Sequence, residues 1–199
     1  MRHVLFVLYT ASWLGWFSAA MLGPIYAIFV QRIGGDLLDA GIAWAIFSIV
    51  MGVLTLIIGR FEDKTFDRRK AVVFGYIVLT LATVGYLFVR SPIQLFIAQA
   101  FLGLGAAINY PAWDTLFSHA VTKDRETTQW AAQEGGIQIV GGIAALAGSY
   151  VANKYGFPIL FIIMACVQGL SMIVSLHLLT KHHAHLKKAK GIKQHGVHR

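Results

Sequence analysis

The sequence has little charge and almost no cysteine. Charged residues make up 13% of its 199 residues, which is about half the share that a soluble domain carries. Its single cysteine, Cys166, cannot form a disulfide within one chain. It also has no glycine-rich loop followed by Lys-Ser or Lys-Thr and no His-Glu-x-x-His motif. These absences exclude an ordinary soluble domain and an ATPase carried by the chain, and they argue against an enzyme.

Long apolar runs dominate what is present. Hydrophobic residues make up 57% of the chain, and they fall in six runs that each reach the ~20 residues needed to cross a bilayer as a helix. Helices are expected because backbone polar groups must be satisfied internally in lipid. We therefore predict an all-α polytopic membrane bundle over residues 1–180, followed by a basic tail over 181–199. The predicted spans are about 4–30, 37–58, 71–89, 93–117, 127–152 and 157–179.

Lys and Arg are distributed unevenly over the predicted loops. Only Arg32, Arg90 and Lys154 fall on one side of the membrane, and the other 14 of the 17 fall on the side of the two termini. The positive-inside rule then predicts cytoplasmic termini, in a plasma or cell inner membrane. Topology thus accounts for the net charge of +8, and we predict no nucleic-acid partner, cofactor or metal site. The tail is expected to rest on anionic lipid head groups.

The first three spans match the last three at an offset of 90 residues. Residues 49–52 (Ile-Val-Met-Gly) fall on residues 139–142 (Ile-Val-Gly-Gly), and Leu56 falls on Leu146. Because three is odd, the second triplet crosses the membrane in the opposite sense. This predicts a 3+3 inverted repeat, which is typical of secondary transporters.

The segment between the second and third spans carries a recognisable pattern. From Gly59 it reads Gly-Arg-Phe-Glu-Asp-Lys-Thr-Phe-Asp-Arg-Arg-Lys. It resembles the loop between helices 2 and 3 of the major facilitator superfamily, Gly-x-x-x-Asp-(Arg/Lys)-x-Gly-(Arg/Lys)-(Arg/Lys). Gly59, Asp63 and Lys64 match. Phe66 stands at the second Gly of the pattern, and Asp67 is an extra residue before the basic run.

Two further segments are similar to the same family. The run from Gln99 through Gly103 and Gly105 resembles its fourth-helix segment Arg-x-x-Gln-Gly-x-Gly-Ala, with Gln99 in place of the Arg of proton-coupled members. Residues 148–157 resemble its exit from helix 5. The resemblance covers essentially the whole chain and implies one six-helix half of a twelve-helix fold.

That resemblance implies a function and a partner. We expect a secondary transporter that moves a small-molecule solute by alternating access. The second half would be another copy of the chain in a homodimer, or a separate six-helix partner. The alternative is a truncated half or an accessory membrane protein that does not transport.

Two acids, Asp114 and Glu134, lie within apolar runs. A carboxylate in hydrocarbon costs about 2.5–3.5 kcal/mol on insertion scales, so such groups usually face protein or water. The resemblance implies that Asp114 joins the helix 2–3 loop in a charge relay that holds the outward-facing state; a structural ion pair is the alternative. Glu134 is either a proton-titrating group or the partner of a basic loop residue such as Arg60. The predicted relay comprises Gly59, Asp63, Lys64, Arg68, Arg69 and Asp114.

Polar and aromatic residues near the middle of the spans suit a small organic solute. The structural alternative is that amides bond between helices and aromatic residues anchor at the interfaces. Pro24 and Pro111 are able to kink the first and fourth spans. The candidate solute or proton path comprises Trp13, Gln99, Asn109, Tyr110, Gln133, Glu134 and Gln138.

Overall fold

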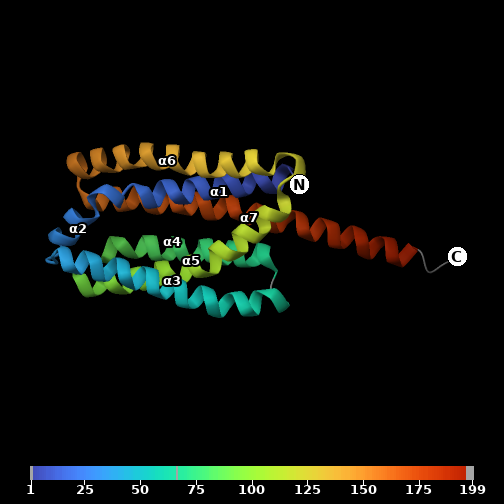
Figure 1. Cartoon of the computed structure of the whole chain (residues 1–199), viewed down its shortest axis with the longest axis horizontal. Coiled ribbons are helices and arrows are strands. Elements are labelled where there is room, and N and C mark those ends of the chain that lie inside the picture. The colour runs from blue at the N-terminus through green and yellow to red at the C-terminus, as the bar shows by residue number, and fades with distance from the viewer. Residues whose placement is uncertain (1, 66, 196–199) are drawn as a thin grey trace.

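The computed structural model describes residues 2–65 and 67–195, and within these ranges the chain is helical without strands (Figure 1). The elements are α1 (Arg2–Ala20), η1 (Gly23–Ile25), α2 (Tyr26–Arg32), α3 (Leu37–Thr65), α4 (Arg68–Gly85), η2 (Tyr86–Phe88), α5 (Pro92–Ala120), η3 (Lys123–Arg125), α6 (Glu126–Tyr155) and α7 (Phe157–His195). The described part has six segments long and apolar enough to cross a membrane: His3–Arg32, Leu37–Gly59, Arg68–Phe88, Pro92–Ala120, Lys123–Tyr155 and Phe157–Thr180. The chain is therefore an integral multi-pass membrane protein, and the predicted all-α bundle of six spans is confirmed.

Short polar and glycine signals separate the spans. Asp36 and Asp39 cap the start of α3 reciprocally, because each backbone N–H donates to the other's carboxylate at 3.0 and 2.9 Å. Ser91 caps α5 ahead of Pro92, whose missing N–H has no cost at a helix start. Gly156, at φ 85°, makes the turn between α6 and α7.

The segment expected as a loop over 59–70 is mostly helical. α3 continues through Thr65, and α4 already begins at Arg68. Asp67 provides the physical reason for the new start, since its side chain accepts from the backbone N–H of Arg69 at 3.1 Å and caps α4. The residue that looks additional in the sequence pattern is thus a helix cap.

The two prolines predicted to kink spans act differently. Pro24 lies in η1, where the first span breaks into α1 and α2. Pro111 lies inside α5, which runs without interruption from Pro92 to Ala120. At the first break α6 approaches closely, because a Cβ on Gly148 would run into the backbone carbonyl of Met21. Only glycine allows this contact.

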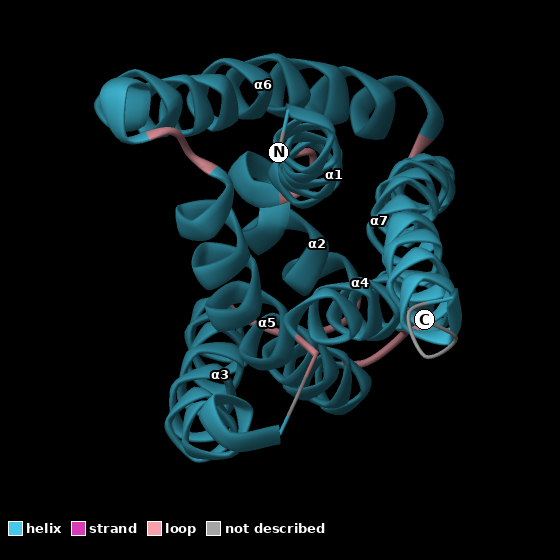
Figure 2. Cartoon of the chain, turned by 90° about the vertical axis from the view of Figure 1, so that its right-hand side faces the viewer, coloured by secondary structure: helices cyan, strands magenta, loops and turns pink. Residues whose placement is uncertain are grey.

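The helices form two groups that pack alike. α1 packs against α6 and α7, while α5 packs against α3 and α4, and α4 also contacts α7 (Figure 1). Under the 90-residue offset α1 corresponds to α5, α3 to α6 and α4 to α7, so the contacts of α1 with α6 and α7 have their counterparts in those of α5 with α3 and α4. Viewed end-on, α6 and α3 lie at opposite edges of the bundle with α1 and α5 between them (Figure 2). This is the arrangement that a 3+3 inverted repeat predicts.

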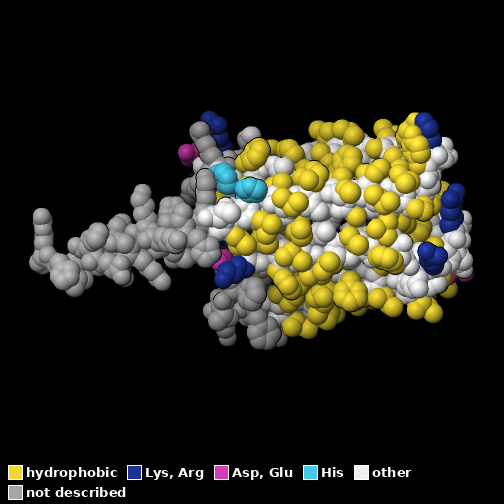
Figure 3. Space-filling model, turned by 180° about the vertical axis from the view of Figure 1, so that it is seen from behind, with side chains coloured by type: hydrophobic (Ala, Val, Ile, Leu, Met, Phe, Trp, Pro, Cys, Tyr) yellow, Lys and Arg dark blue, Asp and Glu magenta, His cyan; other side chains and the backbone are white. Residues whose placement is uncertain are grey.

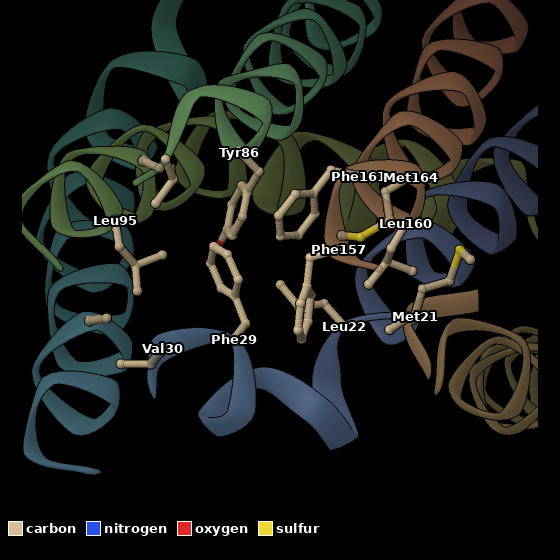
Figure 4. Packing of buried hydrophobic residues seen from close by; sticks show 14 of the residues in the cluster. Met21, Leu22, Phe29, Val30, Tyr86, Leu95, Phe157, Leu160, Phe161 and Met164 are labelled. Carbon is tan, nitrogen blue, oxygen red and sulfur yellow. The ribbon is translucent and has the colours of Figure 1, made fainter. Parts of the chain in front are cut away.

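The interior contains two apolar clusters. One joins α2, α3, η2, α5, α6 and α7 at the end away from the termini, where Phe29 packs edge-on against Phe161 at 4.8 Å between ring centroids (Figure 4). The other lies toward the termini and is centred on Leu8, Val72 and Phe117. Outside, apolar side chains cover the middle of the body, with Lys and Arg at both ends (Figure 3). Both termini lie at the same end, and α7 extends past the bundle there (Figure 1).

Candidate solute site

The segment predicted as a charge relay is described in part. Asp63 and Lys64 belong to the end of α3, and their side chains lie outside the described residues. Gly59 is half-buried, as are Arg68 and Arg69 at the start of α4. The Arg69 guanidinium donates to the backbone carbonyl of Leu178 on α7 at 3.4 Å. Arg69 thus ties α4 to the end of the sixth span.

Two predicted path residues hold helices together. Gln99 is buried on α5 and donates its amide to the hydroxyl of Tyr26 on α2 at 2.7 Å. Asn109 is buried on the same helix and donates to the carbonyl of Val72 on α4 at 2.9 Å. α4 and α5 approach closely there, because a Cβ on Gly75 would lie 2.6 Å from that of Asn109. Both amides therefore serve packing in this conformation.

A second group of predicted residues meets where α1 crosses α6. The buried Gln133 donates its amide to the Ser12 hydroxyl at 2.7 Å. Trp13 lies directly on Gly136, where a Cβ would run into its indole. Within the described residues, the Trp13 Nε1 and the Gln133 Oε1 are buried and have no hydrogen-bond partner. A buried donor and a buried acceptor are thus left open in one helix contact.

An aromatic cluster adjoins this contact toward the end of the termini. Phe117 of α5 stacks on Trp113 at 4.8 Å and meets Trp130 of α6 edge-on at 4.6 Å between centroids. Tyr9 of α1 packs against Phe117 at 5.4 Å and against Trp13 at 5.6 Å. These rings join α1 and α6 of one group of helices to α5 of the other, and they provide a large apolar surface.

The two membrane acids border this cluster. Asp114 lies on α5 and Glu134 on α6; both are exposed on the surface of the chain, and they are close enough to interact electrostatically. Tyr110 lies one turn from Asp114 on the same helix. Gln138 lies one turn from Glu134 and is exposed. Of the predicted path, Trp13 and Gln133 meet at the contact of α1 with α6, Glu134 and Gln138 are exposed on α6, and Tyr110 lies one turn from Asp114 on α5. Gln99 and Asn109 bond to α2 and α4 instead.

Sequence reasoning missed four members of this region: Ser12, Trp113, Phe117 and Trp130. Trp130 and Glu134 are one turn apart on α6, as Phe117 and Asp114 are on α5. The sequence thus shows an aromatic residue one turn from each membrane acid. Whether these two aromatic rings meet depends on the register between α5 and α6, which only the fold supplies.

Comparison with known proteins establishes the family. The family model described as Major Facilitator Superfamily matches residues 8–198, and the chain belongs to that family. It is 25% identical over 179 residues to the multi-drug resistance efflux pump PmrA of Streptococcus pneumoniae, covering 87% of this chain and 44% of PmrA. It is 22% identical over 170 residues to an uncharacterised MFS-type transporter of Methanocaldococcus jannaschii, covering 85% and 44%.

The solved structures agree on the fold. The chain superposes on the POT family transporter PepTSo with a TM-score of 0.75 at 11% identity, covering 88% of this chain and 37% of that one. It therefore has the six-helix half of the major facilitator fold, as predicted, and its family indicates a transporter rather than an enzyme. The chain spans about 44% of the length of the relatives named above.

Proposed function

We propose that this chain is one six-helix half of a secondary transporter that moves a small solute by alternating access. It pairs with a second half, which in the simplest case is another copy of the same chain. The termini then face the cytoplasm of a plasma or cell inner membrane, where the basic residues gather. Pairing is supported by the glycines on the outer surface of α3 and α6.

Glycines on that surface face open space. A Cβ on Gly52 of α3 or on Gly142 of α6 would meet nothing within 4 Å. By contrast, a Cβ on Gly103 of α5 would lie 2.7 Å from the backbone oxygen of Phe47. Gly103 inside the bundle is thus matched by a neighbour, whereas Gly52 and Gly142 on the outer surface of α3 and α6 are not. Small residues on membrane helices allow close approach of another helix.

The open positions on the two helices correspond through the repeat. Gly52 and Gly142 are related by the 90-residue offset, and both are exposed near the middle of their helices. α3 and α6 lie at opposite edges of the bundle (Figure 2). A two-fold axis along the membrane normal would therefore bring α3 of one copy against α6 of the other. Two such contacts would enclose the face that carries Asp114 and Glu134.

Cross-linking tests the pairing. In a Cys166→Ala background, Ser48→Cys and Leu146→Cys place thiols one turn from Gly52 and Gly142, on exposed positions at a similar depth. We expect an intermolecular disulfide in native lipid nanodiscs and a dimer in native mass spectrometry. The matched control carries Phe74→Cys and Ile173→Cys, exposed positions on α4 and α7, and should give none. A monomer without cross-links would contradict pairing of two copies and leave a separate six-helix partner or a non-transporting accessory role.

Alternating access is tested through the proposed relay. Asp114 would hold the basic segment after α3 in the outward-facing state. Asp114→Asn should then shift the labelling of cysteines introduced on the exposed face of α5 while leaving membrane insertion intact. If the labelling pattern does not change, Asp114 has only a structural role.

A further inference from the structure

The contact of α1 with α6 brings three polar side chains together beside an apolar cluster. Ser12 and Trp13 are neighbours on α1, and Gln133 meets them from α6. Ser12 is 7% exposed and Gln133 is 1% exposed. The Gln133 amide nitrogen donates to the Ser12 hydroxyl at 2.7 Å. This bond joins the two helices but uses only part of the hydrogen-bonding capacity of the three side chains.

The atoms that this bond leaves over are complementary. The Trp13 Nε1 is a donor and the Gln133 Oε1 is an acceptor, and both are buried without a partner among the described residues. A Cβ on Gly136 would lie 2.6 Å from that Nε1. Gly136 follows Gln133 by three residues, so the two positions are neighbours on one face of α6, about 5–6 Å apart between Cβ positions. The open donor and the open acceptor therefore face the same turn of α6 without bonding to each other.

The Ser12 hydroxyl adds a third group. It accepts the bond from Gln133 and still has its own hydrogen to donate. A partner for all three groups has to accept from the indole and the hydroxyl and donate to the amide oxygen. Turning the amide over does not remove this need, because its NH₂ and the indole N–H are then two donors that cannot bond to each other.

Other buried hydroxyls at the surface of α1 have direct partners. Ser18 donates to the carbonyl of Met164 on α7 at 2.9 Å. From the other side, Ser171 on α7 donates to the carbonyl of Ala11 at 2.6 Å. The contact of α1 with α7 is thus closed by bonds to the backbone. The open atoms in the contact with α6 are an exception, and buried polar groups of this kind are usually bonded.

We propose that Ser12, Trp13 and Gln133 bind one buried water molecule between α1 and α6. Water both donates and accepts, and a buried water typically makes about three hydrogen bonds to polar groups that have no other partner. The three side chains are neutral, so they offer no charge to an ion. A larger solute would have to separate α1 from α6 to reach them.

This site changes the role of two residues on the predicted solute path. Trp13 and Gln133 join α1 to α6 through water, and a water-mediated bond is nearly as favourable in enthalpy as a direct one. The inference depends neither on pairing nor on transport, and it can be tested on the full chain as a monomer or a dimer.

Water-edited, proton-detected solid-state NMR of the chain in lipid bilayers tests the site. The chain has five tryptophans, and Trp→Phe variants assign their indole N–H signals. We expect rapid transfer of magnetisation from water to the Trp13 indole, although its nitrogen is buried. Trp113 is the internal control, because its Nε1 is also buried without a described partner but its ring stacks on Phe117 in an apolar cluster. Transfer to Trp113 should be several-fold slower.

Gln133→Met tests the acceptor, since it keeps the length of the side chain and removes the amide. Transfer to the Trp13 indole should slow several-fold in this variant. Gln138→Met is the matched control, because Gln138 is exposed on the same helix, and it should change nothing. No transfer to Trp13 in the unmodified chain would overturn the site, as would equal transfer to Trp13 and Trp113 or unchanged transfer in Gln133→Met.

A double-mutant cycle gives an independent measurement. Trp13→Phe removes the indole donor, and Gln133→Met removes the acceptor. Because these two groups do not bond directly, a shared water should couple them, by about two- to tenfold in the unfolding equilibrium constant. Trp113→Phe combined with Gln133→Met should be additive. Additivity of the first pair would contradict a shared water.

Discussion

Replacing Gly148 by alanine tests how tightly the first span is braced against α6. A Cβ at this position would run into the backbone carbonyl of Met21, and its next neighbours are two other Met21 backbone atoms at 2.6 and 2.7 Å. Backbone cannot rotate away as a side chain can, so the break between α1 and α2 has to move. Overpacking of this kind costs about 1–3 kcal/mol.

A second effect acts in the opposite direction. Alanine is favoured over glycine inside a helix by about 0.8–1.0 kcal/mol in water. Gly169 isolates this term, because it lies inside α7 and a Cβ there would meet nothing within 4 Å. Gly169→Ala should therefore be neutral or stabilising. Gly148→Ala should be less stable than Gly169→Ala by about 1–3 kcal/mol, a factor of roughly 5 to 150 in the unfolding equilibrium constant.

The assay is reversible unfolding by SDS in mixed micelles, followed by tryptophan fluorescence. Both variants are compared with the parent chain at the same lipid and detergent composition. Equal stability of Gly148→Ala and Gly169→Ala would refute the close approach of α6 to the break in the first span.

Three further experiments test other contacts. A double-mutant cycle of Gln99→Leu and Tyr26→Phe should give a coupling of about 0.6–1.7 kcal/mol in the same assay, as for other hydrogen bonds between membrane helices, and additive effects would contradict their bond. Asp67→Ala should cost about 1 kcal/mol through the lost cap of α4, and Asp67→Asn should recover most of it; equal loss in both would point to the charge instead. Gly136→Ala should displace the Trp13 indole and change its emission, and a Trp13→Ala partner change should recover stability; no recovery would contradict their contact.

The sequence predicts the fold well because the bilayer imposes simple rules. Span length and hydropathy locate all six helices, and the 90-residue offset anticipates which helices correspond. The prolines show the limit of that reasoning. Pro24 follows Gly23 at the break between α1 and α2, where Gly148 of α6 lies close to Met21, whereas Pro111 lies in a continuous helix. Their surroundings decide the difference, and these are formed by residues distant in sequence.

The candidate site is predictable only in part for the same reason. Asp114 and Glu134 stand out because charge is rare in the spans. Gln99 and Asn109 look equally suited to a solute, but in the structure their amides bond to α2 and α4. Phe117 and Trp130 look like ordinary lipid-facing residues until α5 and α6 are brought together. A polar residue within an apolar span can be recognised from the sequence, whereas the residues that it contacts on other helices cannot.

The packing of α1 against α6 and α7 has a consequence for synthesis in the cell. α1 ends at Ala20, but its partner α7 begins at Phe157. At about 5–20 residues per second, α1 emerges on the order of ten seconds before α7 exists. During that interval Ser12 and Ser18, which later meet α6 and α7, stand in the membrane without these partners. α5, by contrast, meets α3 and α4 as soon as it is made. Within this chain α1 is thus made well before it is packed, and an insertase or chaperone that holds it in the bilayer would shield these hydroxyls during the interval.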